Sequence, residues 1–196
     1  MTLAHPTAPP TGDPGGVACD NVRLLARIDD PAHWQARVGC LLASGRRRWL
    51  GRTEFDAGPL LRQWNRVRLP YTPPGHPTLR SAVAAAVAGA EIPGTPLTEF
   101  AAAIMLLSGC TAVVTVPAGV PDRRRAVSVS LFAFPADDLA LARDLAGVTL
   151  DAAGVVTTRR ETTVFLAARP LPGARARRDQ RLIVPNQERC AVREYH

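Results

Sequence analysis

The chain has 196 residues, a formal net charge of +7 and 46% hydrophobic residues, which is enough for one domain with a sizeable core. Arginine supplies all of the positive side-chain charge, because the sequence contains 24 arginines and no lysine. The lack of lysine excludes a P-loop nucleotide site, the phosphate-binding lysine of kinases and a Schiff-base or pyridoxal phosphate lysine. No stretch reaches the ~18 consecutive apolar residues of a membrane span. We therefore expect a cytoplasmic protein with no membrane partner.

Residues 1–16 are rich in proline and glycine and contain no periodic apolar set. They also lack the basic start and apolar core of a secretory signal. This composition predicts a disordered tail over residues 1–16, followed by a single domain over residues 17–196.

The first elements of the domain have clear local signals. Apolar and polar residues alternate over residues 21–28, which predicts a strand. Asp30 and Pro31 then have the residue types that begin a helix, and we expect Gly45 to end it.

Residues 46–90 carry weaker signals. Residues 46–50 could form a short strand, and the sequence favours a strand at residues 60–69 although the alternation there is imperfect. Several prolines predict a rigid loop at residues 70–77. An alanine-rich helix is expected over residues 78–90, because its larger apolar residues are spaced by four.

The stretch from residue 95 to residue 169 shows the clearest order of elements. Thr95 and Pro96 predict the start of a helix and Gly109 its end, and the apolar run between them predicts burial on most sides. Period-two alternation at residues 112–116 and 126–134 predicts a hairpin.

The second half of that stretch repeats the pattern. A short helix over residues 136–147 and two further strands at residues 148–158 and 162–168 are expected to follow, and one more strand is expected at residues 182–184. The fold class is therefore α+β, with helices on one face of a largely antiparallel or mixed sheet.

Few residues suggest catalysis. His76 lies in a proline-rich loop that could hold its imidazole for proton transfer, and Glu54 and Asp56 form a local carboxylate pair next to a turn. A conformationally fixed turn explains the position of His76 without any chemistry. The four cysteines have no paired spacing, so we expect neither a metal nor another cofactor.

Arginine clusters are the remaining candidates for function. The favoured arrangement has a tight turn at residues 151–154 between two strands, and it brings together at one end of the sheet Arg123, Arg124, Arg125, Arg159 and Arg160. If residues 148–158 form one descending strand instead, the last two arginines lie at the opposite end. Clustered guanidinium groups suit carboxylate or phosphate binding, although a solvated surface is also expected in a chain without lysine.

These features predict a non-catalytic binding or accessory domain whose arginine-rich end engages an acidic protein or an anionic ligand. The alternative is a small cofactor-free enzyme with a pocket between sheet and helices. Nucleic-acid binding is weaker, because aromatic residues make up only 5% of the chain. A sizeable apolar pocket with His76 or Glu54 pointing into it favours the enzyme, whereas a closed core and a flat arginine face favour binding.

Overall fold

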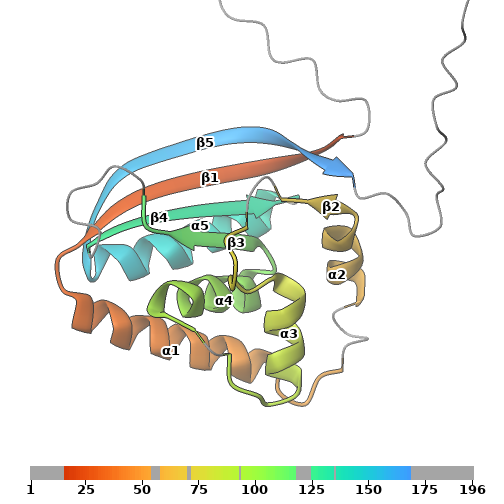
Figure 1. The fold of residues 1–196 in the computed structure, drawn as a ribbon, viewed down its shortest axis with the longest axis horizontal. Coiled ribbons are helices and arrows are strands. Elements are labelled where there is room, and N and C mark those ends of the chain that lie inside the picture. The colour runs from red at the N-terminus through yellow and green to blue at the C-terminus, as the bar shows by residue number, and fades with distance from the viewer. Residues whose placement is uncertain are drawn as a thin grey trace, which may run out of the picture.

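The computed structural model describes residues 16–53, 58–69, 72–92, 94–117, 125–134 and 136–168. Within these ranges, five helices and five strands form an α+β domain in which helices pack against one face of the sheet (Figure 1). The expected tail lies outside the described residues except for Gly16, at which the first strand begins. The strand expected at residues 182–184 also lies outside them.

The sheet has the strand order β2-β5-β1-β4-β3, and all neighbouring strands are antiparallel. The long first strand, β1, lies at its centre. The strands are β1 (Gly16–Ile28), β2 (Val67–Arg68), β3 (Thr111–Thr115), β4 (Ala126–Ala133) and β5 (Gly154–Ala168).

The helices gather on one face of the sheet, and α4 lies between the other helices (Figure 1). This face carries Val22, Leu24, Val129 and Leu131. They are α1 (Pro31–Trp49), α2 (Gly58–Asn65), α3 (Leu79–Val87), α4 (Pro96–Ser108) and α5 (Ala136–Asp151). Among these described helices, none combines the length and the apolar character needed to cross a bilayer.

Helix α4 forms as its local sequence predicts. Thr95 caps it, and the Thr98 side chain accepts a 2.8 Å hydrogen bond from the Thr95 amide in return. Gly109 ends the helix with a φ of 78°, a left-handed conformation that favours glycine, and its amide donates to the Met105 carbonyl. Ile104 is 0% exposed, so the prediction of a deeply buried helix is confirmed.

Helix α1 starts at the expected Asp30 cap but does not end at Gly45. It continues to Trp49, so the interpretation of residues 46–50 as a short strand is wrong. Gly45 lies against α4, where a Cβ atom would be 2.9 Å from Leu106 Cβ, and Trp49 Nε1 donates to the Leu106 carbonyl at 2.9 Å. Packing on α4 therefore extends α1 through a glycine that otherwise ends helices.

Two further expectations are wrong for related reasons. Residues 60–69 contribute only β2 to the sheet, because α2 occupies the first half of that segment. Helix α5 continues past residue 147 because Ala142, Ala146 and Leu150, spaced by four, are all buried against the core. Residues 154–168 are then one strand, and no tight turn between strands exists at residues 151–154.

The sheet curls so that its two edges approach each other. Strand order places β2 and β3 at opposite edges, yet Val67 of β2 and Val113 of β3 belong to one apolar cluster with Phe132 and Leu166. Residues of both edge strands, Val67 and Arg68 of β2 and Thr111 and Val113 of β3, also line one cavity. This curl creates the concave site described next.

Candidate anion-binding cavity

A cavity of about 460 Å³ lies between the two edges of the curled sheet. We call it the edge cavity. Its walls come from α2 and β2 on one side and from β3, the loop before α3 and the start of α3 on the other. Apolar side chains line much of it, namely Leu61, Trp64, Val67, Leu69, Leu79 and Val113, and polar ones are Asn65, Arg68, Thr72, Thr78, Arg80 and Thr111.

Trp64 is a fixed part of this wall. Its indole Nε1 donates to the Gly109 carbonyl at 3.2 Å, and its ring packs on Phe134 with 4.6 Å between the centroids. These two contacts join α2 to the end of α4 and to the end of β4. The aromatic wall therefore does not depend on a ligand for its position.

Arginine gives the cavity its charge. Arg68 and Arg80 line it from β2 and α3, both are exposed, and neither forms an ion pair or a side-chain hydrogen bond with any residue that the structure describes. No aspartate or glutamate is among the lining residues that the structure describes. The charged side chains of this described lining are therefore all positive.

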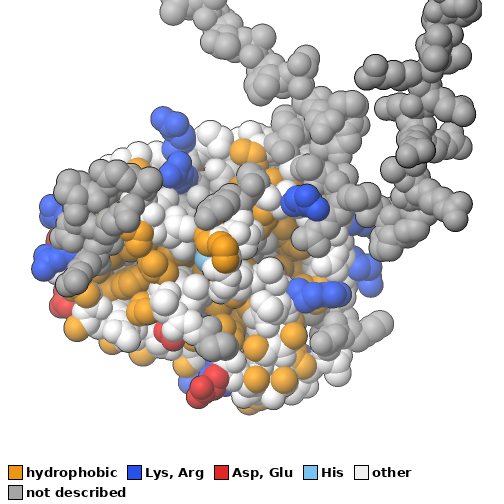
Figure 2. All heavy atoms as spheres, in the orientation of Figure 1, with side chains coloured by type: hydrophobic (Ala, Val, Ile, Leu, Met, Phe, Trp, Pro, Cys, Tyr) orange, Lys and Arg blue, Asp and Glu red, His pale blue; other side chains and the backbone are white. Residues whose placement is uncertain are grey.

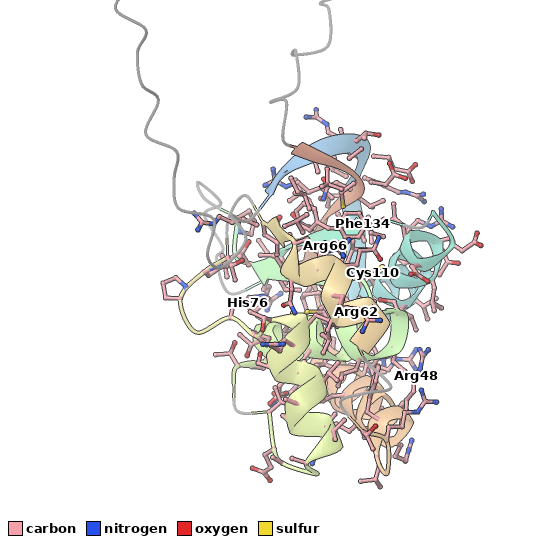
Figure 3. The ribbon with its side chains drawn as sticks, turned by 90° about the vertical axis from the view of Figure 1, so that its right-hand side faces the viewer. Arg48, Arg62, Arg66, His76, Cys110 and Phe134 are labelled. Atoms are coloured by element: carbon pink, nitrogen blue, oxygen red, sulfur yellow. The ribbon has the colours of Figure 1, made fainter. Side chains whose placement is uncertain are left out.

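Two more arginines lie on the same side of the molecule. Arg62 and Arg66 project from α2 and the turn that follows it, as Figure 3 shows. In Figure 2 basic side chains lie at the right of the view, at its top and at its left edge, and the acidic side chains visible lie at the left and bottom. We refer to Arg62, Arg66, Arg68 and Arg80 as the arginine rim.

The start of α3 is already capped. The Thr78 hydroxyl accepts from the Ser81 amide at 3.1 Å, and the Ser81 hydroxyl accepts from the Thr78 amide at 2.9 Å. This reciprocal pair satisfies the amides of Thr78 and Ser81. The guanidinium groups of Arg68 and Arg80 are the charged donors of the cavity.

His76 lies beside the cavity but does not line it. Its Nε2 accepts from the Val114 amide of β3 at 3.1 Å, so the proton is on Nδ1, which donates to the Pro77 carbonyl at 3.1 Å. Burial lowers the pKa of His76, and this effect is larger than the opposite effect of the hydrogen bond to Pro77, which raises the pKa. The imidazole closes the outer edge of β3, a structural role that leaves neither nitrogen free for proton transfer.

Two cysteines near the sheet are unreactive. Burial raises the pKa of Cys19 to about 11, and it raises the pKa of Cys110 to about 12. Both therefore remain protonated thiols, which are poor nucleophiles.

Of the other candidates from the sequence, the structure describes only Arg125, Arg159 and Arg160. Glu54, Asp56, Arg123 and Arg124 lie outside the described residues. Arg125 precedes β4, where its carbonyl accepts from the Ile28 amide at 2.6 Å. Ile28 pairs with Gly154 at the start of β5, so Arg125 lies about five strand residues from Arg159, or ~16 Å.

Arg159 and Arg160 are adjacent in β5 and therefore point to opposite faces of the sheet. Arg159 pairs in register with buried Leu24 and forms an ion pair with Glu161. Arg160 lies directly opposite Arg23 of β1, on the face away from the helices. Sequence inspection did not single out Arg23, because only the strand register makes it a neighbour of Arg160.

Comparison of the chain with protein-family models, with curated proteins and with solved structures gave no match. The cavity residues Arg68 and Arg80 were also missed from the sequence. Each is a single arginine, and a proline-rich loop separates them. Their proximity depends on the curl of the sheet, which has no short-range sequence signal.

Proposed function

We propose that this domain is a non-catalytic binding module that takes an anionic ligand into the edge cavity. The observation that carries the proposal is an apolar and aromatic wall next to two arginines, Arg68 and Arg80. Among the residues that the structure describes, these arginines have no ion-pair partner and the cavity has no acidic lining residue. A carboxylate or phosphate bound by guanidinium groups and an apolar body packed near Trp64 match this arrangement.

The size of the cavity supports a small ligand. Pockets for small molecules have volumes of roughly 300–1,000 Å³ and combine apolar walls with a few polar groups. The edge cavity, at about 460 Å³, falls within this range. An acidic side chain of a protein partner offers the same chemistry, and the experiment below distinguishes such a partner from a small ligand.

Binding is favoured over catalysis by the side chains that line the cavity. Within the described part of the chain, they include three threonines and an asparagine but no histidine, cysteine, aspartate, glutamate or tyrosine. General acid–base catalysis needs a group with a suitable pKa within hydrogen-bond distance of the reacting atom. The nearest histidine, His76, uses both ring nitrogens in hydrogen bonds to the backbone.

Nucleic-acid binding is less well supported. Single-stranded nucleic acids bind on exposed aromatic side chains along a basic groove. Trp64 is half-buried and is held by Phe134 and Gly109, so its ring does not form an open stacking surface.

The test is a thermal-shift screen with aromatic carboxylates and phosphate monoesters, followed by calorimetric titration at low and high salt. We expect a ligand that raises the melting temperature and whose affinity falls with added salt. The double variant Arg68→Gln/Arg80→Gln should lose binding by at least tenfold, because each charged hydrogen bond contributes ~1.5–3 kcal/mol.

Arg23→Gln/Arg160→Gln provides a control with the same net charge, since it removes two exposed arginines from the outer sheet face. It should bind with unchanged affinity. Equal loss in both double variants would show that only total charge matters, and unchanged binding in the cavity variant would refute the site. Binding of acidic peptides but no small molecule would replace the small ligand by a protein partner.

A further inference from the structure

A second concave surface lies between α1 and α5, and its character differs from that of the edge cavity. It is a groove with a volume of about 410 Å³. Leu41 and Cys40 contribute from α1, and Leu141, Leu145 and Val148 contribute from α5. We call this surface the α1–α5 groove.

Helix α5 is apolar on two sides. Ala142, Ala146 and Leu150 face the core and are fully buried. Leu141, Leu145 and Val148, at spacing i, i+4, i+7, form a ridge along the groove, where Leu141 is 45% and Val148 is 60% exposed. An amphipathic surface helix packs on the core with one apolar side only. The second, exposed apolar ridge of α5 therefore indicates a contact surface.

The two walls of the groove have opposite charge. Arg37 lines it from α1 and forms no ion pair with any described residue. Asp144 lines it from α5, where its only ion pair within the described ranges is an exposed one with the neighbouring Arg143. The charges of the described lining residues cancel, although the whole chain carries +7.

We propose that the α1–α5 groove is the contact surface between two copies of this chain related by a two-fold axis. In this arrangement the α5 ridge of each copy lies in the groove of the other. Arg37 of each copy then faces Asp144 of its partner. Such a contact requires a surface that is complementary to itself, which a ridge beside a hollow and an acid beside a base provide.

Electrostatics favours this face over others for self-association. Two chains of +7 repel each other, and the repulsion is largest where basic side chains meet. The arginine rim is such a surface, whereas the groove is neutral. The apolar ridge supplies the attraction and the charge pair fixes the register.

The decisive experiment uses charge reversal and measures molar mass by light scattering on the full chain. Arg37→Asp places Asp against Asp at both symmetry-related contacts, and Asp144→Arg places Arg against Arg. We expect the wild type to be dimeric and each variant alone to dissociate at least tenfold more readily. In an equimolar mixture of the two variants both contacts become Asp–Arg, so the dimer mass should return.

Two apolar substitutions provide a matched control. Val148→Arg in the ridge should give a monomer, and Val155→Arg on β5, where the valine is 50% exposed outside the groove, should remain dimeric. A monomeric wild type, or a dimer that persists in Val148→Arg, would overturn the proposal. A mixture that stays monomeric would also overturn it, and a helix of another protein would then be the alternative occupant of the groove.

Thiol labelling gives an independent measurement. Cys40 is exposed in the groove, whereas Cys19 and Cys110 are buried. In a Cys190→Ser background, maleimide should modify Cys40 more slowly in the dimer than in Asp144→Arg. Equal rates in the two proteins would contradict burial of the groove between copies.

Discussion

The helix-covered face of the sheet and the edge cavity differ in how completely their side chains are buried. On the helix-covered face Phe100, Ile104 and Leu131 are 0% exposed and belong to one continuous core. Around the edge cavity Trp64 and Leu69 are only partly buried, and the arginine rim is exposed. The same sheet therefore supports a closed core and an open concave surface.

This difference suggests a division of roles. The helix-covered face supplies most of the apolar burial and hence most of the folding free energy. The edge cavity is held by a much smaller apolar cluster and by polar contacts such as the His76–Val114 and Trp64–Gly109 hydrogen bonds. Binding sites commonly lie in such regions of lower local stability. Substitutions on the two sides should therefore have effects of different size and extent.

The largest effect is expected from Ile104→Asp in α4. An unpaired buried charge costs several kcal/mol, which is comparable with the ~5–15 kcal/mol that stabilises a domain. The variant should be unfolded by circular dichroism and should lack a cooperative melting transition. Leu50→Asp, at a leucine that is 65% exposed just after α1, should fold normally. A folded Ile104→Asp protein would refute the central position of α4.

A smaller effect is expected where α1 meets α4. A methyl group at Gly45 would lie 2.9 Å from Leu106 Cβ, so Gly45→Ala should lower the free energy of unfolding by about 1–3 kcal/mol. Gly39 lies in the same helix, but a Cβ there meets nothing within 4 Å. Gly39→Ala should therefore stabilise the protein by ~0.5–1 kcal/mol through helix propensity.

Urea denaturation measures both glycine variants. The opposite signs are the informative result, because a general intolerance of α1 to substitution would lower stability in both. Stabilisation by Gly45→Ala would mean that α1 and α4 are not closely packed at this point.

These two sides also differ in how far the sequence predicted them. Thr95, Pro96 and Gly109 are local signals for α4, and the alternation in β3 and β4 predicted their hairpin. The prediction that Gly45 ends α1 was wrong because this glycine is buried against Leu106, which lies 61 residues away in sequence. The prediction that α5 ends at residue 147 was wrong because the burial of Leu150 outweighs the low helix propensity of the residues around it.

The candidate site was harder to predict than the fold. Sequence clustering drew attention to Arg159 and Arg160, but strand alternation sends neighbouring side chains to opposite faces. Arg68 of β2 and Arg80 of α3 line the same cavity, which also has residues of β3 in its wall although β2 and β3 lie at opposite ends of the strand order. Long-range geometry of this kind leaves no pattern in a single sequence.

The smallest and most local effect is expected at His76, beside the edge cavity. Burial lowers its pKa below the ordinary value of 6.5, so the folded protein binds this proton less tightly than the unfolded chain does. The contribution of neutral His76 to stability is therefore complete above pH 6.5 and is lost as the pH falls from 6.5 toward the lower pKa of the folded state. The melting temperature of the wild type should fall through this window more steeply than that of His76→Gln. His33→Gln, at an exposed histidine, controls for the removal of one imidazole.

Hydrogen exchange gives a second measurement. Because the Val114 amide donates to His76 Nε2, the exchange of this amide, corrected for the intrinsic effect of pH, should accelerate below pH 6.5 while the α4 amides stay protected. Parallel melting curves for the wild type and His76→Gln, or loss of protection in α4 at the same pH as in Val114, would mean that the edge cavity does not open independently of the core.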